Sequence, residues 1–174
     1  MKYLRIIFIF LLFTTNVDAQ KIGTFKFSLI LQNLESYKNF MIKLDDFKKK
    51  KFEELRNQEN LLVTELKEIE DSKILLSEIE YLSRISKFEE DKKNFENKVN
   101  NLNKYITENI EFNENKILKE TIEIVKKIDI KNNIDIIFYD DQYFLSSDNI
   151  DISGLIFNDL NQLNLSLELN EYEQ

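Results

Sequence analysis

Paired carboxylates are the strongest candidates for acid–base chemistry in this sequence. Asp45-Asp46 and Asp140-Asp141 each place two carboxyl groups side by side, as general acid–base catalysis can use. Neither pair has a partner base nearby, and the chain contains no histidine and no cysteine. Catalysis by Ser-His or Cys-His groups and metal sites of Cys and His ligands are therefore excluded. We interpret the pairs as a helix surface and a turn, and predict no catalytic, cofactor-binding or metal-binding residue and no enzyme activity.

The charged residues narrow the range of partners. The chain has 24 basic and 32 acidic residues, a formal net charge of −8, which argues against a nucleic-acid partner. Lys48–Lys51 form a run of four cations. We interpret this run as a solvated helix face. The alternative is attraction of acidic polypeptides or transient contact with a membrane surface, where each lysine contributes at most about 1 kcal/mol.

The first residues predict export. Lys2 and Arg5 precede an apolar run over residues 6–13, and Val17-Asp18-Ala19 supplies small residues for cleavage after Ala19. The run is shorter than the roughly 20 residues that span a membrane. We therefore predict a signal peptide over residues 1–19 and a periplasmic location; the alternative is a buried N-terminal helix. Removal of the signal leaves 155 of the 174 residues, about one domain.

Two long segments carry apolar residues at helical spacing. The chain has no proline and only two glycines, which favours long uninterrupted helices. We predict helices over residues 28–72 and 77–128, paired along an apolar seam. A polar residue at a seam position, such as Asn113, can fix the register. The seam candidates are Leu55, Leu62, Leu66 and Ile69 in the first segment, and Leu82, Phe88, Phe95, Val99 and Leu102 in the second.

A turn near residues 72–77 joins the two predicted helices. Ser77 and Glu80 have the Ser-x-x-Glu spacing of a capping box, in which the hydroxyl accepts a backbone N–H and the glutamate reaches back. The alternative is one continuous helix of about 100 residues. We prefer a hairpin over residues 34–128 because the two apolar stripes have similar lengths.

Short strands are expected on both sides of this hairpin. Residues 21–27 alternate apolar and polar, and residues 134–139 are rich in β-branched and aromatic side chains. Asp140-Asp141 is expected to turn the chain into another strand at residues 143–145. A helix capped by Asp151 or Ser153 then runs to about Leu163. Residues 20–33 and 129–167 thus form a small β-rich body, and the acidic residues 168–174 are expected to be frayed.

Such a small body needs self-association. Three strands and one short helix make a poor core by themselves, which joining several copies would solve. The candidates for the interface between copies are apolar residues of the predicted strands and their flanks: Ile22, Phe25, Phe27, Ile136, Phe138 and Phe144.

The whole pattern resembles the Skp/OmpH family of periplasmic chaperones. The resemblance rests on Lys21-Ile22-Gly23-Thr24-Phe25, on Ile134–Phe138, and on Ser147–Ser153 with its Asp-Ile-Ser element, together with the length and place of the hairpin. It implies an α+β, mostly helical fold with long antiparallel coiled-coil arms on a β-structured trimerisation body. It also implies an ATP-independent holdase that encloses unfolded outer-membrane β-barrel proteins between three arms and delivers them for membrane assembly.

The arms would carry the contacts with such clients. Apolar side chains off the seam suit this role, and Phe47 and Tyr81 are the candidates. Typical members of the family have basic arm tips, whereas residues 65–96 here hold ten acidic and six basic side chains. We therefore expect client binding by apolar contact more than by charge. The alternative function is a structural coiled-coil spacer or adaptor without holdase activity.

Overall fold

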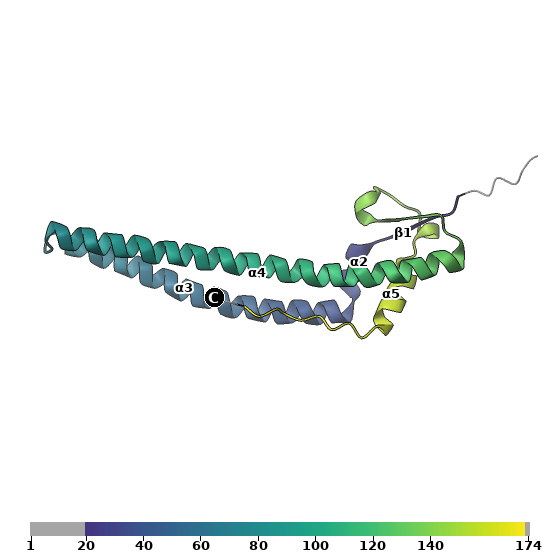
Figure 1. Ribbon diagram of the computed structural model, residues 1–174, viewed down its shortest axis with the longest axis horizontal. Helices are drawn as coiled ribbons and strands as arrows, with labels where there is room; N and C mark the ends of the chain where they lie inside the picture. The colour runs from purple at the N-terminus through teal and green to yellow at the C-terminus, as the bar shows by residue number, and fades with distance from the viewer. Residues whose placement is uncertain (1–19, 173–174) are drawn as a thin grey trace, which may run out of the picture.

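Two long antiparallel helices dominate the molecule, and a small body closes one end (Figure 1). The computed structural model describes residues 20–172, so the predicted signal peptide and the last two residues lie outside the described part. The predicted fold class is confirmed: the chain is mostly helical with a small two-stranded sheet. In chain order the elements are β1 (Ile22–Phe25), α2 (Phe27–Asn33), α3 (Glu35–Ser72), α4 (Glu78–Asn132), β2 (Ile136–Tyr139), the 3-10 turns η1 (Asp140–Gln142) and η2 (Asp148–Ile150), and α5 (Ser153–Gln162).

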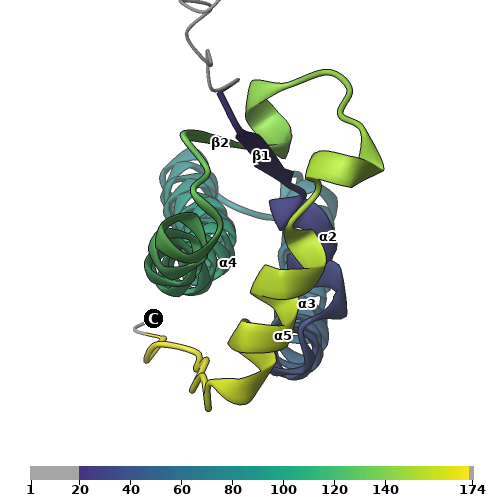
Figure 2. The ribbon, with the colours of Figure 1, turned by 90° about the vertical axis from the view of Figure 1, so that its right-hand side faces the viewer.

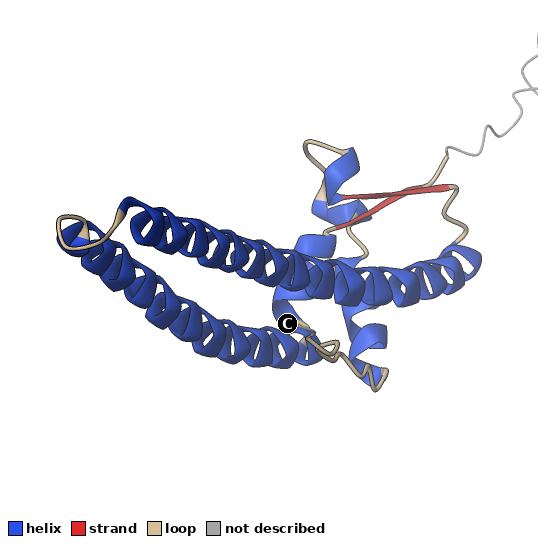
Figure 3. Ribbon diagram, turned by 60° about the vertical axis from the view of Figure 1, so that its left-hand side comes forward, coloured by secondary structure: helices blue, strands red, loops and turns tan. Residues whose placement is uncertain are grey.

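The hairpin turn lies between Ser72 and Glu78, so the alternative of one continuous helix does not apply. The predicted capping box is confirmed. The Ser77 hydroxyl accepts the Glu80 N–H at 3.4 Å, and the Glu80 carboxylate accepts the Ser77 N–H at 3.0 Å. This reciprocal pair satisfies two backbone donors that α4 itself cannot satisfy. α3 and α4 then pack along each other towards the body (Figure 3).

The first predicted helix is broken in two. Leu34 adopts an extended conformation between α2 and α3, with φ −67° and ψ 119°. Its side chain is 2% exposed, so the break inserts a leucine into the core at the arm base. The expectation of one helix from Ser28 is therefore wrong, because burial of Leu34 outweighs helical continuity. α4 ends at Asn132, and Asn133 takes the left-handed conformation that often terminates helices.

The sheet contains two parallel strands rather than a β-hairpin. β1 pairs with β2 from Ile22 opposite Ile136 to Phe25 opposite Tyr139. The predicted strand at residues 143–145 is wrong: the chain forms turn η1, and Phe144 and Leu145 are exposed. In place of a third strand, β1 makes a single bridge, between Thr24 and Asp151.

The core lies where the arm bases, the sheet and α5 meet. α5 crosses the open end of the hairpin beneath the sheet (Figure 2). Buried side chains from both arms, including Phe40, Leu44 and Ile117, pack with Ile156 and Leu160 of α5. The core therefore extends into residues 34–128, the range predicted for the arms. Gly23 permits close strand contact, since a Cβ there would lie 3.3 Å from Ile137.

Candidate functional site

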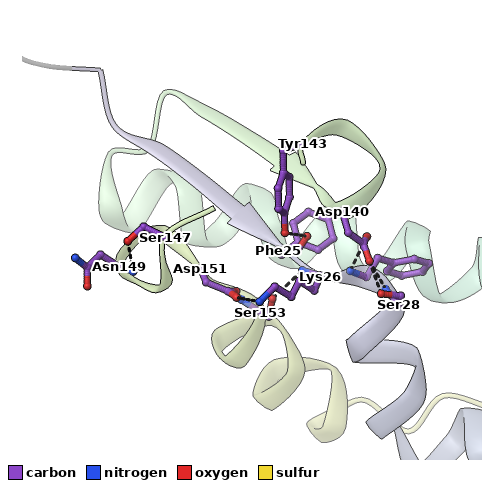
Figure 4. A network of polar contacts seen from close by, with 10 residues as sticks. Phe25, Lys26, Ser28, Asp140, Tyr143, Ser147, Asn149, Asp151 and Ser153 are labelled. Atoms are coloured by element: carbon purple, nitrogen blue, oxygen red, sulfur yellow. Dashed lines mark hydrogen bonds and ion pairs between the residues drawn. The ribbon is translucent and has the colours of Figure 1, made fainter. Parts of the chain in front are cut away.

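The Asp140 carboxylate ties the end of β2 to the start of α2 (Figure 4). It accepts the backbone N–H groups of Phe27 at 3.0 Å and Ser28 at 2.9 Å, and also the Ser28 hydroxyl. Burial alone would raise the pKa of Asp140, but these hydrogen bonds outweigh it and lower the pKa below its ordinary value. Because Asp140 caps α2, the chain winds into η1 instead of making a hairpin turn. Of the Asp140-Asp141 pair, Asp140 is thus a structural cap.

Asp151 links α5 to β1 in the same way. Its carboxylate accepts the Ser153 N–H at 2.8 Å, so Asp151 satisfies the first donor of α5 from the residue before the N-cap, which is Ile152. The carboxylate also lies 3.4 Å from the Lys26 ammonium group. The Ser153 hydroxyl accepts the Lys26 N–H at 2.8 Å. Burial opposes ionisation of Asp151, but the contacts with Ser153 and Lys26 lower its pKa. Both caps bind the body together, so the carboxylates of Asp140 and Asp151 make structural contacts.

The six candidates for the interface between copies divide into two sets. Phe25 is buried in the chain's own core, and Phe27 is half-buried against that core. Ile22 and Ile136 are exposed at the first pair of the sheet, and Phe138 is half-buried on the same face. Phe144 is fully exposed beyond η1. The outward sheet face and Phe144 therefore remain as an apolar surface on the body.

The predicted seam lies mostly between the arms. Ile69, Phe88 and Leu102 are buried, and a further five seam candidates are half-buried: Leu55, Leu62, Leu66, Phe95 and Val99. Leu82 is an exception, because it is 56% exposed while its neighbour Ile85 is half-buried. Leu82 instead extends an apolar surface at the arm tip, where Ile74, Leu75 and Ile79 are also exposed.

The two side chains predicted to contact clients, Phe47 and Tyr81, each contact other side chains of the chain itself. Phe47 lies with its ring centroid 5.0 Å from that of Tyr105 and 5.5 Å from that of Tyr172. The Lys73 ammonium group lies 5.3 Å from the centroid of the Tyr81 ring. More exposed apolar side chains project from the arms off the seam: Ile42, Phe52, Leu61, Val63, Phe112 and Ile122. Their exposure was not evident from sequence, where Phe52 fits the seam spacing.

The lysine run is partly neutralised by its own helix. Lys49 pairs with Asp45 at 2.8 Å, and Lys51 pairs with Glu54 at 2.7 Å. The hydrogen bond from Lys49 lowers the pKa of Asp45, which places one member of the Asp45-Asp46 pair in an exposed ion pair. Lys49 agrees with the interpretation of a solvated helix face, whereas the Lys51 side chain is only 17% exposed and lies over the Tyr172 ring.

Residues 163–172 form an extended segment that lies against the arms, on the side away from the sheet (Figure 2). We call it the C-terminal strap. The expectation of a frayed tail is wrong for residues 168–172, since Leu167 is 6% exposed and Tyr105 donates a hydrogen bond to the Asn170 carbonyl at 2.6 Å. The strap has a period-two signal in the sequence, with leucine at 163, 165, 167 and 169. Asn113 lies where a seam residue was expected and binds this strap.

A cleft of about 600 Å³ opens between the arms, closer to the arm tips than the strap. Leu62 and Phe95 line it with polar residues that include Gln58 and Lys98. Within residues 20–172 no cluster of acidic side chains could hold a metal ion. None of the helices in the described chain has the length and apolar character needed to cross a membrane.

The architecture is close to that of one solved protein. A crystal structure from Caulobacter crescentus CB15, described as an outer membrane chaperone (OmpH-like), matches with a TM-score of 0.70 and covers 92% of this chain and 95% of its own. This chain has the OmpH-like fold. The sequence identity is 11%, so the resemblance seen in the sequence is confirmed at the level of the fold.

No family model matches the sequence, and no curated protein matches it significantly. The features that the sequence shares with the Skp/OmpH family therefore lie in the arrangement of the elements more than in residue identity.

Proposed function

We propose that this protein is a periplasmic holdase chaperone that binds unfolded outer-membrane β-barrel proteins without ATP and delivers them for membrane assembly. The observation that carries the proposal is the set of exposed apolar side chains on arms that extend far beyond the core. α3 has 38 residues, or about 57 Å of helix, and α4 has 55. The OmpH-like fold supports the same function.

Exposed apolar side chains off the seam suit the capture of unfolded chains. Phe52, Leu61 and Phe112 belong to different parts of the arms, so each can contact a different segment of a client. Individual contacts of this kind are weak, but several arms linked in one assembly raise the effective concentration. A client without fixed structure needs such a distributed surface, because no single shape is presented.

Trimerisation would bring three pairs of arms together around one cavity. The outward face of the sheet supplies a surface for it, since Ile22 and Ile136 are 42% and 40% exposed there and Phe138 is half-buried. Phe144, beyond η1, is a further exposed apolar side chain of the body. Apolar patches of this kind mark association sites.

The predicted signal peptide supports the periplasm as the place of action, and the fold of an outer membrane chaperone supports it independently. In that compartment β-barrel precursors expose alternating strands that aggregate unless they are shielded. A holdase there works by binding alone.

Dilution of a urea-unfolded porin into buffer tests the function. Mature protein at stoichiometric amounts should suppress porin aggregation measured by light scattering, without ATP. The triple variant Phe52→Ser, Leu61→Ser, Phe112→Ser should protect several-fold less, because it removes exposed apolar surface.

A matched control replaces exposed polar residues of the same arms: Asn57→Ser, Asn60→Ser and Asn115→Ser. This control should protect as well as the unmodified protein. Porin that aggregates equally with and without the unmodified protein would reject the holdase and favour a structural spacer.

A further inference from the structure

A row of polar side chains on one face of α4 holds the backbone of the C-terminal strap. The row consists of Tyr105, Asn109, Asn113 and Lys116. These residues are spaced 4, 4 and 3 positions apart, so they share one helix face. Lys116 donates to the Ser166 carbonyl at 2.6 Å and Asn113 donates to the Glu168 carbonyl at 3.1 Å, while Asn109 accepts the Asn170 N–H at 2.8 Å and Tyr105 donates to the Asn170 carbonyl at 2.6 Å. We call this row the α4 track.

The α4 track contacts main-chain groups at every second residue of the strap. Main-chain hydrogen bonds are available from any extended polypeptide, so this mode of binding does not depend on the sequence bound. The intervening leucines supply the apolar contact: Leu167 is buried in the core, and Leu165 and Leu169 pack against it. The α4 track and the core beside it therefore suit an extended chain in which apolar residues alternate with others, as in the strands of a β-barrel.

The hydrogen bonds of the strap come from one side, while Phe47 and Lys51 of α3 contact only the Tyr172 ring at its end. All four hydrogen bonds reach α4, and within residues 20–172 none joins the strap to α3. A cavity of about 390 Å³ lies between the strap and the base of α3, lined by Asn39 and Lys43 among others. Release of the strap therefore breaks no hydrogen bond to α3, although it uncovers Leu167 and its apolar contacts in the core.

The α4 track has unused capacity for another chain. The Asn113 amide oxygen is buried and has no hydrogen-bond partner in the described chain, so it can accept a backbone N–H. Tyr172 lies at a small cavity that shares Gln58 and Lys98 with the larger cleft between the arms. An extended chain on the track could therefore continue into that cleft, past Leu62 and Phe95.

We propose that the α4 track is a binding site for an extended polypeptide segment with alternating apolar residues, and that the C-terminal strap is its resident occupant. A client segment displaces the strap and takes its backbone hydrogen bonds. The strap covers the α4 track when no client is present. This inference deepens the proposed function and rests on it for the nature of the client, an unfolded β-barrel protein.

A reversible lock of the strap tests the proposal in the full chain. The chain has no cysteine, so Lys116→Cys with Ser166→Cys introduces the only two thiols, both at exposed positions. A short, reducible thiol cross-linker then fixes the strap on α4. The probe is a fluorescein-labelled peptide with the sequence of residues 163–172, and fluorescence anisotropy measures its binding. The locked protein should bind it at least about tenfold more weakly than the same protein after reduction, because the track stays occupied.

Loosening the strap should have the opposite effect. The variant Leu167→Ser with Leu169→Ser weakens the apolar contacts of the strap and leaves the α4 track unchanged. The probe should therefore bind about tenfold more tightly. Glu171→Ser, an exposed position in the strap, is the matched control and should leave binding unchanged. A second peptide of the same composition with its four leucines contiguous should bind more weakly.

The outcomes separate this inference from the proposed function. Equal probe binding by locked and reduced protein would overturn the α4 track, even if porin aggregation is suppressed. Probe binding that responds to the lock, in a protein that does not protect porin, would retain the track and reject the holdase.

Discussion

The Tyr37 hydroxyl on α3 donates a hydrogen bond to the Glu114 carboxylate on α4 at 2.6 Å. The bond crosses the base of the hairpin, next to the buried Phe40, whose ring centroid lies 6.0 Å from that of Tyr37. Burial raises the pKa of the tyrosine, and the hydrogen bond to the Glu114 carboxylate raises it further. The two arms are therefore joined by a charge-assisted bond where they leave the core.

We expect Tyr37→Phe to lower the free energy of unfolding by about 1–3 kcal/mol, because hydrogen bonds to charged groups contribute about this much. Urea denaturation followed by circular dichroism measures the change. Tyr81→Phe is the control, since the Tyr81 hydroxyl makes no hydrogen bond within residues 20–172 and its removal should change little. Equal stability of Tyr37→Phe and the unmodified protein would contradict a role for this bond.

Stability should fall in acid because of two caps in the body. The pKa values of Asp140 and Asp151 are lowered by folding, so the unfolded chain binds protons more readily than the folded chain. Their contribution is therefore present above the ordinary value of 3.8 and is lost as the pH falls through the lower folded values. Urea midpoints measured from pH 6 to pH 2 test this.

The variant Asp140→Asn separates that contribution from general acid effects. It should be less stable at pH 6, where the unmodified carboxylate is charged and bonded to Phe27 and Ser28. The difference between the two proteins should narrow as the pH falls. A difference that is constant with pH would show that the charge of Asp140 is irrelevant.

Phe138→Asp should disrupt assembly through the body. A charge on the outward sheet face would be desolvated at an interface between copies, at a penalty of several kcal/mol. Light scattering should give about three times the mature mass for the unmodified protein and a smaller mass for the variant. Ile74→Asp at the arm tip is the control and should remain a trimer. An unmodified protein that stays monomeric at all concentrations would reject the trimer.

Client binding should depend only modestly on salt. The arm tips are acidic and two lysines of the run Lys48–Lys51 already pair with carboxylates of the same helix, so apolar contact should supply most of the affinity. Between low and physiological salt we expect less than a tenfold loss of porin affinity, about 1.4 kcal/mol. Titration of labelled porin at several salt concentrations measures it. A larger loss would point instead to capture of clients by the lysine run.

The amino-acid sequence by itself determined the hairpin. Apolar residues at helical spacing and the near absence of helix breakers predict two long helices, and the pair Ser77 and Glu80 places the start of the second. These signals are local, because each depends on residues within one or two helical turns. The caps of the body are also local in part, since Asp151 bonds the Ser153 N–H only two residues along the chain.

Only the tertiary structure decided the parts that depend on distant partners. Asp140 caps the start of α2 where the sequence predicted a hairpin turn. The N–H groups that it accepts, from Phe27 and Ser28, lie more than 100 residues away in the sequence. The strap follows the same rule: four alternating leucines indicate an extended segment, but Asn109 and Asn113 on α4 decide where it binds. Long-range pairing of this kind leaves little trace in sequence spacing, because either partner alone is compatible with a solvated surface.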